Sequence, residues 1–327
     1  MHSLIHVEGI HKRFRVSRRQ GGLGRAVQAL VHRQTEEIHA LNDLAFDISD
    51  GEIVGYIGPN GAGKSTTIKV LCGVLVPDSG TCTVDGLVPW RDRVRHVARI
   101  GVVFGQRSQL WWDVPVVDSF ELLRDIYRVP QAAYAARLEE MVHLLRLEEL
   151  LPTPVRALSL GQRMRCELAA SLLHRPRILF LDEPTIGLDA VTKLAVRDFI
   201  QRLNREEGTT VILTTHDMQD IEALAQRILL IGKGRILLDG SLGDLHARAQ
   251  VGPQLTLVYQ GARPQPETDM ILLSDDPGRM VLSLSPAQGS LNRAIASLSG
   301  QTQVVDVAVH APSAEEMVAA LYREYQL

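Results

Sequence analysis

Short runs of Ile, Val and Leu recur along the first two thirds of the chain. Four of them span residues 52–57, 100–104, 178–181 and 210–214, and stretches of helical periodicity lie between them. Runs of this length without alternation are typical of strands that are buried on both faces, with helices crossing from one strand to the next. The pattern predicts a parallel sheet in an α/β domain.

The beginning of the chain has a different pattern. Residues 5–15 and 40–48 alternate apolar and polar positions, which is typical of half-exposed antiparallel strands. Between them, residues 17–38 carry several arginines, a Gly-Gly pair and apolar positions at helical spacing. We expect a mixed α/β domain with an antiparallel β edge, and we interpret 17–38 as an inserted basic loop with a short amphipathic helix.

The middle of the chain, from about residue 107 to 172, is expected to form a helical subdomain. Residues 115–151 have helical periodicity throughout. The apolar face of the predicted helix consists of Leu138, Met141, Val142, Leu144 and Leu145.

Beyond Leu245 the pattern predicts a second, small α+β module, which divides the chain into residues 1–245 and 246–327. The expected strands are 254–258, 270–273, 280–284 and 304–309, and the expected helices are 291–298 and 314–325. Ser313 and Glu316 stand in the spacing of a capping box, so they are expected to begin the last helix.

Composition and charge narrow the possible functions. The chain has 327 residues, of which 45% are hydrophobic, and a net charge of only -3, so no global field attracts nucleic acid. Its three cysteines show no metal-ligand spacing, as expected of reduced thiols in a cytosol. We see neither a signal peptide nor an apolar run of ~18 to 20 residues. We therefore expect the protein to stay inside the cell and to need a partner for any work on a membrane.

The strongest chemical signal is a phosphate-binding loop between a predicted strand and a predicted helix. It fits the pattern G-x-x-x-x-G-K-[ST] and consists of Gly58, Pro59, Asn60, Gly61, Ala62, Gly63, Lys64, Ser65 and Thr66. Its glycines let backbone N–H groups surround phosphate oxygens, and Lys64 places a charge near the β- and γ-phosphates. Ser65 is positioned to ligate Mg²⁺. The pattern predicts a nucleotide site.

Two carboxylates, Asp182 and Glu183, end the apolar strand 178–181 at the edge of the sheet where ligands collect. Asp182 is placed to hold Mg²⁺ through water, and Glu183 to polarise the water that attacks the γ-phosphate. At this point helicases, kinases and GTPases remain alternatives, because a phosphate-binding loop does not identify the family.

The next motif favours one family. Residues 158–165, Leu-Ser-Leu-Gly-Gln-Arg-Met-Arg, closely resemble the signature sequence of ABC ATPases and precede the Asp-Glu strand as they do in that family. The resemblance implies that Ser159, Leu160, Gly161 and Gln162 close over the ATP held by a second copy, with Ser159 at a helix N-terminus that faces the γ-phosphate. Leu160 stands where most members have glycine.

Four further positions match the family pattern in order. The resemblance implies that Gln106 contacts Mg²⁺ and the attacking water, that Asp189 links the two sites of a dimer, and that His216 contacts the γ-phosphate. Phe14 stands where the family has an aromatic that stacks on adenine, although a phenylalanine on an alternating strand is also a common core residue.

Residues 103–113, 17–38 and 158–164 together are similar to ATPase subunits of bacterial viologen or multidrug exporters. The resemblance implies an ATP- and Mg²⁺-dependent hydrolase that works as a homodimer beneath separate membrane permease subunits, at the cytoplasmic face of a bacterial membrane. Importers carry the same catalytic motifs, so export rests on resemblance alone. A soluble ABC ATPase acting on ribosomes or nucleic acid is the alternative, and a regulatory protein with an inactive site is a third class.

Two hypotheses concern segments outside these motifs. Trp111 and Trp112 follow Gln106 and are candidates for a surface on which a permease helix docks, since aromatic residues concentrate at interface hot spots. Packing inside the helical subdomain is the alternative. The arginines of 17–38 are candidates for contact with anionic lipid or permease, with a solvated loop as the alternative.

Overall fold

The computed structural model describes residues 3–17, 35–105, 107–215, 217–285 and 289–325. The chain divides into two compact units, Met1–Asp239 and Gly240–Leu327. The division precedes the expected one after Leu245, because helix α9 (Leu242–Ala249) packs against α11 (Ala314–Glu324) within the second unit.

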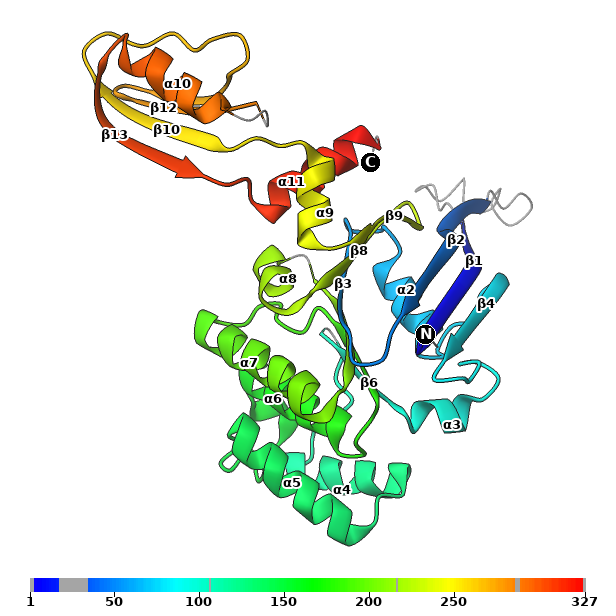
Figure 1. Ribbon diagram of the computed structural model, residues 1–327. Coiled ribbons are helices and arrows are strands. Elements are labelled where there is room, and N and C mark those ends of the chain that lie inside the picture. The colour runs from blue at the N-terminus through cyan, green and yellow to red at the C-terminus, as the bar shows by residue number, and fades with distance from the viewer. Residues whose placement is uncertain (1–2, 18–34, 106, 216, 286–288, 326–327) are drawn as a thin grey trace, which may run out of the picture. The chain divides into compact units, whose positions relative to one another are not determined.

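A six-stranded sheet forms the centre of the first unit (Figure 1). The neighbouring strands are, in order, β5 (Ile100–Phe104), β6 (Ile178–Asp182), β7 (Thr210–Thr214), β3 (Ile53–Ile57), β8 (Arg227–Gly232) and β9 (Arg235–Gly240). The strands from β5 to β8 are parallel neighbours, and most of their side chains are buried. The four runs that predicted parallel strands all lie in this sheet, which confirms that prediction.

A three-stranded antiparallel sheet accompanies it, with β1 (Ile5–Ser17) between β2 (Thr35–Ile48) and β4 (Ser79–Val84). Helix α2 (Lys64–Leu71) contacts both β2 and β6, so it lies between the two sheets (Figure 1). The predicted α/β domain with an antiparallel edge is confirmed. The expected insert 17–38 overlaps these strands, since β1 extends to Ser17 and β2 begins at Thr35. Its residues 18–34 lie outside the described part of the chain.

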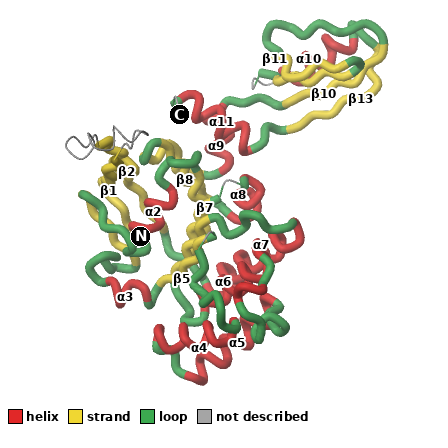
Figure 2. The backbone as a smooth tube through the Cα atoms, turned by 180° about the vertical axis from the view of Figure 1, so that it is seen from behind, coloured by secondary structure: helices red, strands yellow, loops and turns green. Residues whose placement is uncertain are grey.

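Several further helices belong to the first unit. They are α3 (Arg93–Val97), α4 (Val116–Tyr127), α5 (Gln131–Leu145), the 3-10 turn Val155–Ala157, α6 (Leu160–Leu172), α7 (Ala190–Glu207) and α8 (Met218–Leu224). Figure 2 shows α4, α5, α6 and α7 grouped together. Helix α6 contacts α4, α5 and the edge strand β5. Through α6, the helical subdomain is attached to the central sheet.

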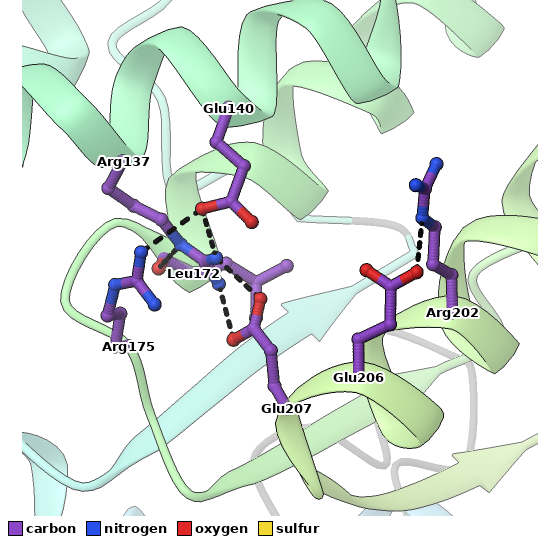
Figure 3. Close-up of polar contacts among 7 residues, drawn as sticks. All are labelled: Arg137, Glu140, Leu172, Arg175, Arg202, Glu206 and Glu207. Carbon is purple, nitrogen blue, oxygen red and sulfur yellow. Dashed lines mark hydrogen bonds and ion pairs between the residues drawn. The ribbon is translucent and has the colours of Figure 1, made fainter.

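Arg137 of α5 is completely buried, although the apolar pattern of this helix did not indicate it. Its guanidinium donates hydrogen bonds to Glu207 at the end of α7, to Glu140 and to the Leu172 carbonyl (Figure 3). Arg175 adds a second donor to Glu140 at 3.1 Å. A buried charge is tolerated only when it is paired and hydrogen-bonded, and this cluster joins three helices at one point.

The second unit contains a four-stranded antiparallel sheet and its own apolar core. The strands are, in order, β11 (Ile271–Asp276), β12 (Arg279–Ser283), β10 (Gln254–Gln260) and β13 (Gln303–His310). Ala294 and Leu298 of α10 (Ser290–Ser299) belong to this core. The structure contains all four predicted strands and both predicted helices, and Ser313 and Glu316 form the expected capping box.

In the part of the chain that the structure describes, we find no helix with the length and apolar character needed to cross a membrane.

Candidate functional site

The loop between β3 and α2 has the tight backbone that its glycines predict. Gly63 has φ +115°, a conformation that side chains rarely allow, and a Cβ there would lie 2.6 Å from the Ala40 carbonyl oxygen. A Cβ on Gly58 would lie 2.7 Å from the Ile231 carbonyl oxygen. Both positions therefore require glycine, and the backbone of the loop is held against β2 and β8.

Lys64 begins α2 and is 7% exposed. Its Nζ donates hydrogen bonds to the carbonyl oxygens of Gly58, at 2.6 Å, and Pro59, at 3.2 Å, so the side chain folds back over the loop. Burial lowers the pKa of Lys64 from its usual value, while attraction by Glu183 and Asp182 raises it. The ammonium group is thus already directed at the space that the loop encloses.

Asp182, Glu183 and Ser65 come together at the carboxyl ends of the strands. Ser65 Oγ lies 3.5 Å from Asp182 Oδ1. The Glu183 N–H donates to the Thr214 carbonyl oxygen at 2.9 Å, and Glu183 has φ +55°, an uncommon conformation for a residue with a side chain. The end of β7 thus fixes the backbone at which the carboxylates leave β6.

These residues line a cavity of about 920 Å³, which also includes residues of the phosphate-binding loop and of the segment after β5. The Ser65 hydroxyl and the Asp182 carboxylate face this space with the oxygen ligands that Mg²⁺ prefers, so the donor set fits the expected metal. A second hollow of about 910 Å³, beside α4 and α5, contains none of the predicted site residues.

The signature residues lie at the start of α6 and form a complete capping box. The Gln162 N–H donates to Ser159 Oγ at 3.2 Å, and the Ser159 N–H donates to Gln162 Oε1 at 2.8 Å. Ser159 is exposed, while Leu160, Gly161 and Gln162 are half-buried. Among the described residues that line the cavity, none belongs to the signature. A single copy therefore does not bring the two motifs together in that cavity.

Asp189 caps the N-terminus of α7, where it accepts hydrogen bonds from the Thr192 N–H at 2.9 Å and the Thr192 hydroxyl at 2.7 Å. The beginning of α7 is close to the signature, because a Cβ on Gly161 would lie 3.2 Å from Thr192 and one on Gly187 would lie 2.8 Å from the Leu160 side chain. Leu160, which replaces the usual glycine, thus fills the space beside Gly187.

Phe14 lies away from this geometry. Phe14 is 38% exposed on β1, so it is not a core residue, and Lys12 Nζ lies 5.9 Å from its ring centroid. It does not line the cavity. Gln106 and His216 are both outside the described residues, so their expected roles stay predictions.

The structure adds residues that sequence reasoning missed. The Thr214 hydroxyl donates to Asp182 Oδ1 at 2.6 Å. The buried Asp220 accepts hydrogen bonds from the Thr185 hydroxyl and, at 2.6 Å, from Arg197 Nε of α7. The position of Thr214 at the end of a predicted strand was a usable signal for the first contact. No such signal existed for Asp220, because these two partners come from separate segments of the chain.

Comparisons with known proteins agree with this geometry. A family model described as "ABC transporter" matches residues 41–186. The chain is 31% identical over 209 residues to the ABC transporter ATP-binding protein NatA of Bacillus subtilis, covering 64% of this chain and 85% of NatA. It is 32% identical over 250 residues to the Nod factor export ATP-binding protein I of Ralstonia nicotianae, covering 76% and 77%.

Among solved structures, the chain resembles a dimeric ATP-binding cassette in a post-hydrolysis state bound to ADP and Pi. The TM-score is 0.61 and the identity 26%, over 73% of this chain and 98% of that chain. The observed sheets and helices thus correspond to those of an ATPase cassette.

Proposed function

Because the chain belongs to the ABC transporter ATP-binding proteins and is an ATP hydrolase, we propose that it acts as a homodimer. In this dimer the phosphate-binding loop of each copy is completed by the signature of the other. One observation carries the proposal. The cavity lined by Ser65, Asp182 and Glu183 includes no described signature residue, while the capped N-terminus of α6 is exposed at Ser159.

The side chains of the cavity supply the groups that hydrolysis needs. Backbone N–H groups of the loop 58–66, in which Pro59 has none, and the Lys64 ammonium hold the β- and γ-phosphates. Ser65 and Asp182 would hold Mg²⁺, with Gln106 as a further ligand, and the bound ion would neutralise charge on the phosphate oxygens. Glu183 accepts a proton from the attacking water while the bond between the γ-phosphorus and the bridging oxygen breaks. His216 and, across the dimer, Ser159 and Gly161 contact the γ-phosphate.

The helix dipole explains why the second copy binds when ATP is present. The N-terminus of α6 carries a partial positive charge, and its N–H groups are suited to an anion. The γ-phosphate supplies that anion, so ATP joins the two copies and its hydrolysis releases them. Asp189, at the start of α7 beside the signature, is placed to communicate between the two sites.

We further propose that the dimer energises a separate membrane permease from the cytoplasmic side of a bacterial membrane, and that the cargo consists of drugs or other hydrophobic or cationic small molecules that are exported. The similarity to a Nod factor export protein supports the direction. Trp111 and Trp112 are 41% and 51% exposed, which supports a docking role and not packing in the core.

Mixing two inactive variants tests the trans arrangement. Lys64→Ala removes the phosphate-binding charge, and Gly161→Asp places a carboxylate at the N-terminus of α6, where it repels phosphate. Each variant alone is expected to lose ATPase activity. In a heterodimer, the intact loop of the Gly161→Asp copy meets the intact signature of the Lys64→Ala copy.

Each heterodimer is therefore expected to have about half of the wild-type activity, because one of its two sites is complete. Random pairing in an equal mixture makes about half of the dimers heterodimers, so the whole mixture should recover roughly a quarter. No recovery, with both variants folded as judged by their melting temperatures, would contradict the trans arrangement. A mixture of Lys64→Ala with Lys64→Ala/Gly161→Asp is the matched control, since it contains no complete site.

A separate experiment addresses the permease. The wild type and the Trp111→Ala/Trp112→Ala variant are produced in the native host, and their fractions in washed membranes are compared. We expect the variant to leave the membrane fraction while it still binds ATP. Equal retention of both proteins would remove these tryptophans from the docking surface.

A further inference from the structure

The segment that follows Gln106 is held by a buried carboxylate on the signature helix. We propose that Glu167 is a positioning residue that clasps residues 107–113 to α6, so that this segment and the signature move as one body. The inference deepens the proposed function and rests on it, because the position of the signature matters only if it completes a second copy's site.

The clasp consists of three hydrogen bonds between α6 and two consecutive residues. The Ser108 hydroxyl and the Gln109 N–H donate to the two carboxylate oxygens of Glu167, the latter at 3.2 Å. In the opposite direction, Gln109 Nε2 donates to the Glu167 carbonyl oxygen at 3.0 Å. Side chain and backbone on both sides are engaged, which fixes the orientation of the segment as well as its distance.

Because Glu167 is buried, it needs the hydrogen-bond donors of this segment. Glu167 is 4% exposed, and burial raises its pKa, although the hydrogen bonds from Ser108 and Gln109 lower it. A carboxylate withdrawn from water is destabilised unless hydrogen-bond donors replace the lost water. Glu167 therefore depends on the segment for its hydrogen bonds, and the segment cannot leave α6 without exposing or orphaning the carboxylate.

The same segment is fastened at both ends to parts of the site. At its start, the Arg107 N–H donates to the Phe104 carbonyl oxygen at 3.0 Å, and Phe104 is paired with Asp182 between β5 and β6. Towards its end, the Arg163 guanidinium of α6 lies 5.8 Å from the Trp112 ring centroid. A continuous set of contacts thus runs from the carboxylate strand to the signature helix, with Glu167 at its centre and an exposed tryptophan beside it.

Loss of the clasp is expected to affect hydrolysis more than nucleotide binding. The hydrogen-bond partners of Glu167, Ser108 and Gln109, lie outside the phosphate-binding loop, so we expect the affinity of the loop for ATP to be preserved. The signature, by contrast, would be presented to the second copy in a wider range of orientations. Positioning errors of this kind lower the rate of the chemical step.

The test compares Ser108→Ala and Glu167→Gln with wild type, measuring kcat for ATP hydrolysis and, in the Glu183→Gln background, the Kd of a fluorescent ATP analogue. We expect kcat to fall about tenfold, as for the loss of a hydrogen bond to a charged group, and the Kd to change less than about twofold. The kcat of the Ser108→Ala/Glu167→Gln double variant is expected to equal that of Glu167→Gln alone, because both substitutions break the same contact.

Two variants serve as controls. Ser108→Thr keeps the hydroxyl and is expected to retain wild-type kcat. Glu140→Gln makes the same chemical change in the Arg137 cluster of the same subdomain, and is expected to leave kcat within about twofold of wild type, because it does not touch residues 107–113. Ser108 is exposed, so Ser108→Ala and Ser108→Thr decide the matter if Glu167→Gln does not fold.

Unchanged kcat in both Ser108→Ala and Glu167→Gln would overturn the inference. An equal fall in the kcat of Glu140→Gln would also overturn it, since that would show that general loosening of the subdomain lowers the rate. Failure of the proposed function is seen separately, as absence of recovery in the mixed Lys64→Ala and Gly161→Asp dimer.

Discussion

The hydroxyl of Thr214 donates a hydrogen bond to Asp182 Oδ1 at 2.6 Å, and the carbonyl oxygen of the same threonine accepts the N–H of Glu183 at 2.9 Å. One residue at the end of β7 thereby orients the proposed metal-binding carboxylate and fixes the backbone of the proposed base. Strand pairing between β6 and β7 places Asp182 directly beside Thr214. The register of the sheet is therefore part of the site.

Replacing Thr214 with Val keeps its size and removes the hydroxyl. We expect kcat to fall about tenfold and the Mg²⁺ concentration for half-maximal activity to rise, because Asp182 loses a donor that orients it. Titration of ATPase activity with Mg²⁺ measures both quantities. Thr214→Ser should behave like wild type, and equal Mg²⁺ dependence in the Val and Ser variants would show that the hydroxyl does not orient the metal site.

Lys64→Met is expected to abolish detectable hydrolysis and to weaken ATP binding by more than about tenfold, since the phosphates lose the ammonium group that is hydrogen-bonded to the loop. Titration of a fluorescent ATP analogue measures the affinity. Lys69 lies on the same helix and also lines the cavity, so Lys69→Met compares a second cation of the same site, and it should bind ATP more tightly than Lys64→Met. Indistinguishable affinities would argue against the role of Lys64.

The Arg137 cluster in Figure 3 is expected to support the fold and not the chemistry. Arg137→Met should lower the free energy of unfolding by about 2 to 3 kcal/mol, because Glu207 and the Leu172 carbonyl lose their donor. The exposed Arg202 to Glu206 pair on α7 offers a control, for which Arg202→Ala should cost less than about 0.5 kcal/mol. Urea denaturation followed by circular dichroism compares the two variants, and equal losses would contradict the distinction.

The burial of His174 predicts that the fold loses stability in acid. Its Nε2 lies 2.9 Å from the Ile100 carbonyl oxygen, its ring stacks on Tyr127, and burial lowers its pKa from 6.5 to about 4. Between these pH values the unfolded chain binds a proton that the folded chain does not. Stability is therefore lost as the pH falls from 6.5 towards 4, by about 3 kcal/mol at 1.36 kcal/mol per pKa unit.

His174→Gln should flatten that part of the stability profile, because glutamine does not titrate. Urea midpoints at pH 7.5 and pH 5 for both proteins measure the effect. If wild type and His174→Gln lose the same stability between these pH values, the histidine is not the cause.

Much of the fold was predictable because buried strands have recognisable apolar runs in the sequence. The four apolar runs became neighbouring strands, and the Ser313 capping box begins α11 as expected. The order of the strands was not predictable, since an apolar run does not specify its neighbour. Nor was the burial of Arg137, because a charged residue is normally exposed and its partner Glu207 lies 70 residues away.

The candidate site, too, was predictable only in part. Ser65 and Asp182 were expected at one edge of the sheet, because ligands collect where parallel strands end, and the structure places them 3.5 Å apart. The clasp between Ser108 and Glu167 had no local signal. It depends on how a loop and a helix separated by 59 residues pack together.

The most direct test of the central claim is the mass of purified Glu183→Gln protein in solution, measured by light scattering with and without ATP and Mg²⁺. Removing the proposed base should stop hydrolysis and trap the closed pair, so we predict a dimer with ATP and Mg²⁺ and a monomer without them, while the wild type hydrolyses ATP. A Glu183→Gln protein that stays monomeric with ATP and still hydrolyses it would contradict both the role of Glu183 and the shared site.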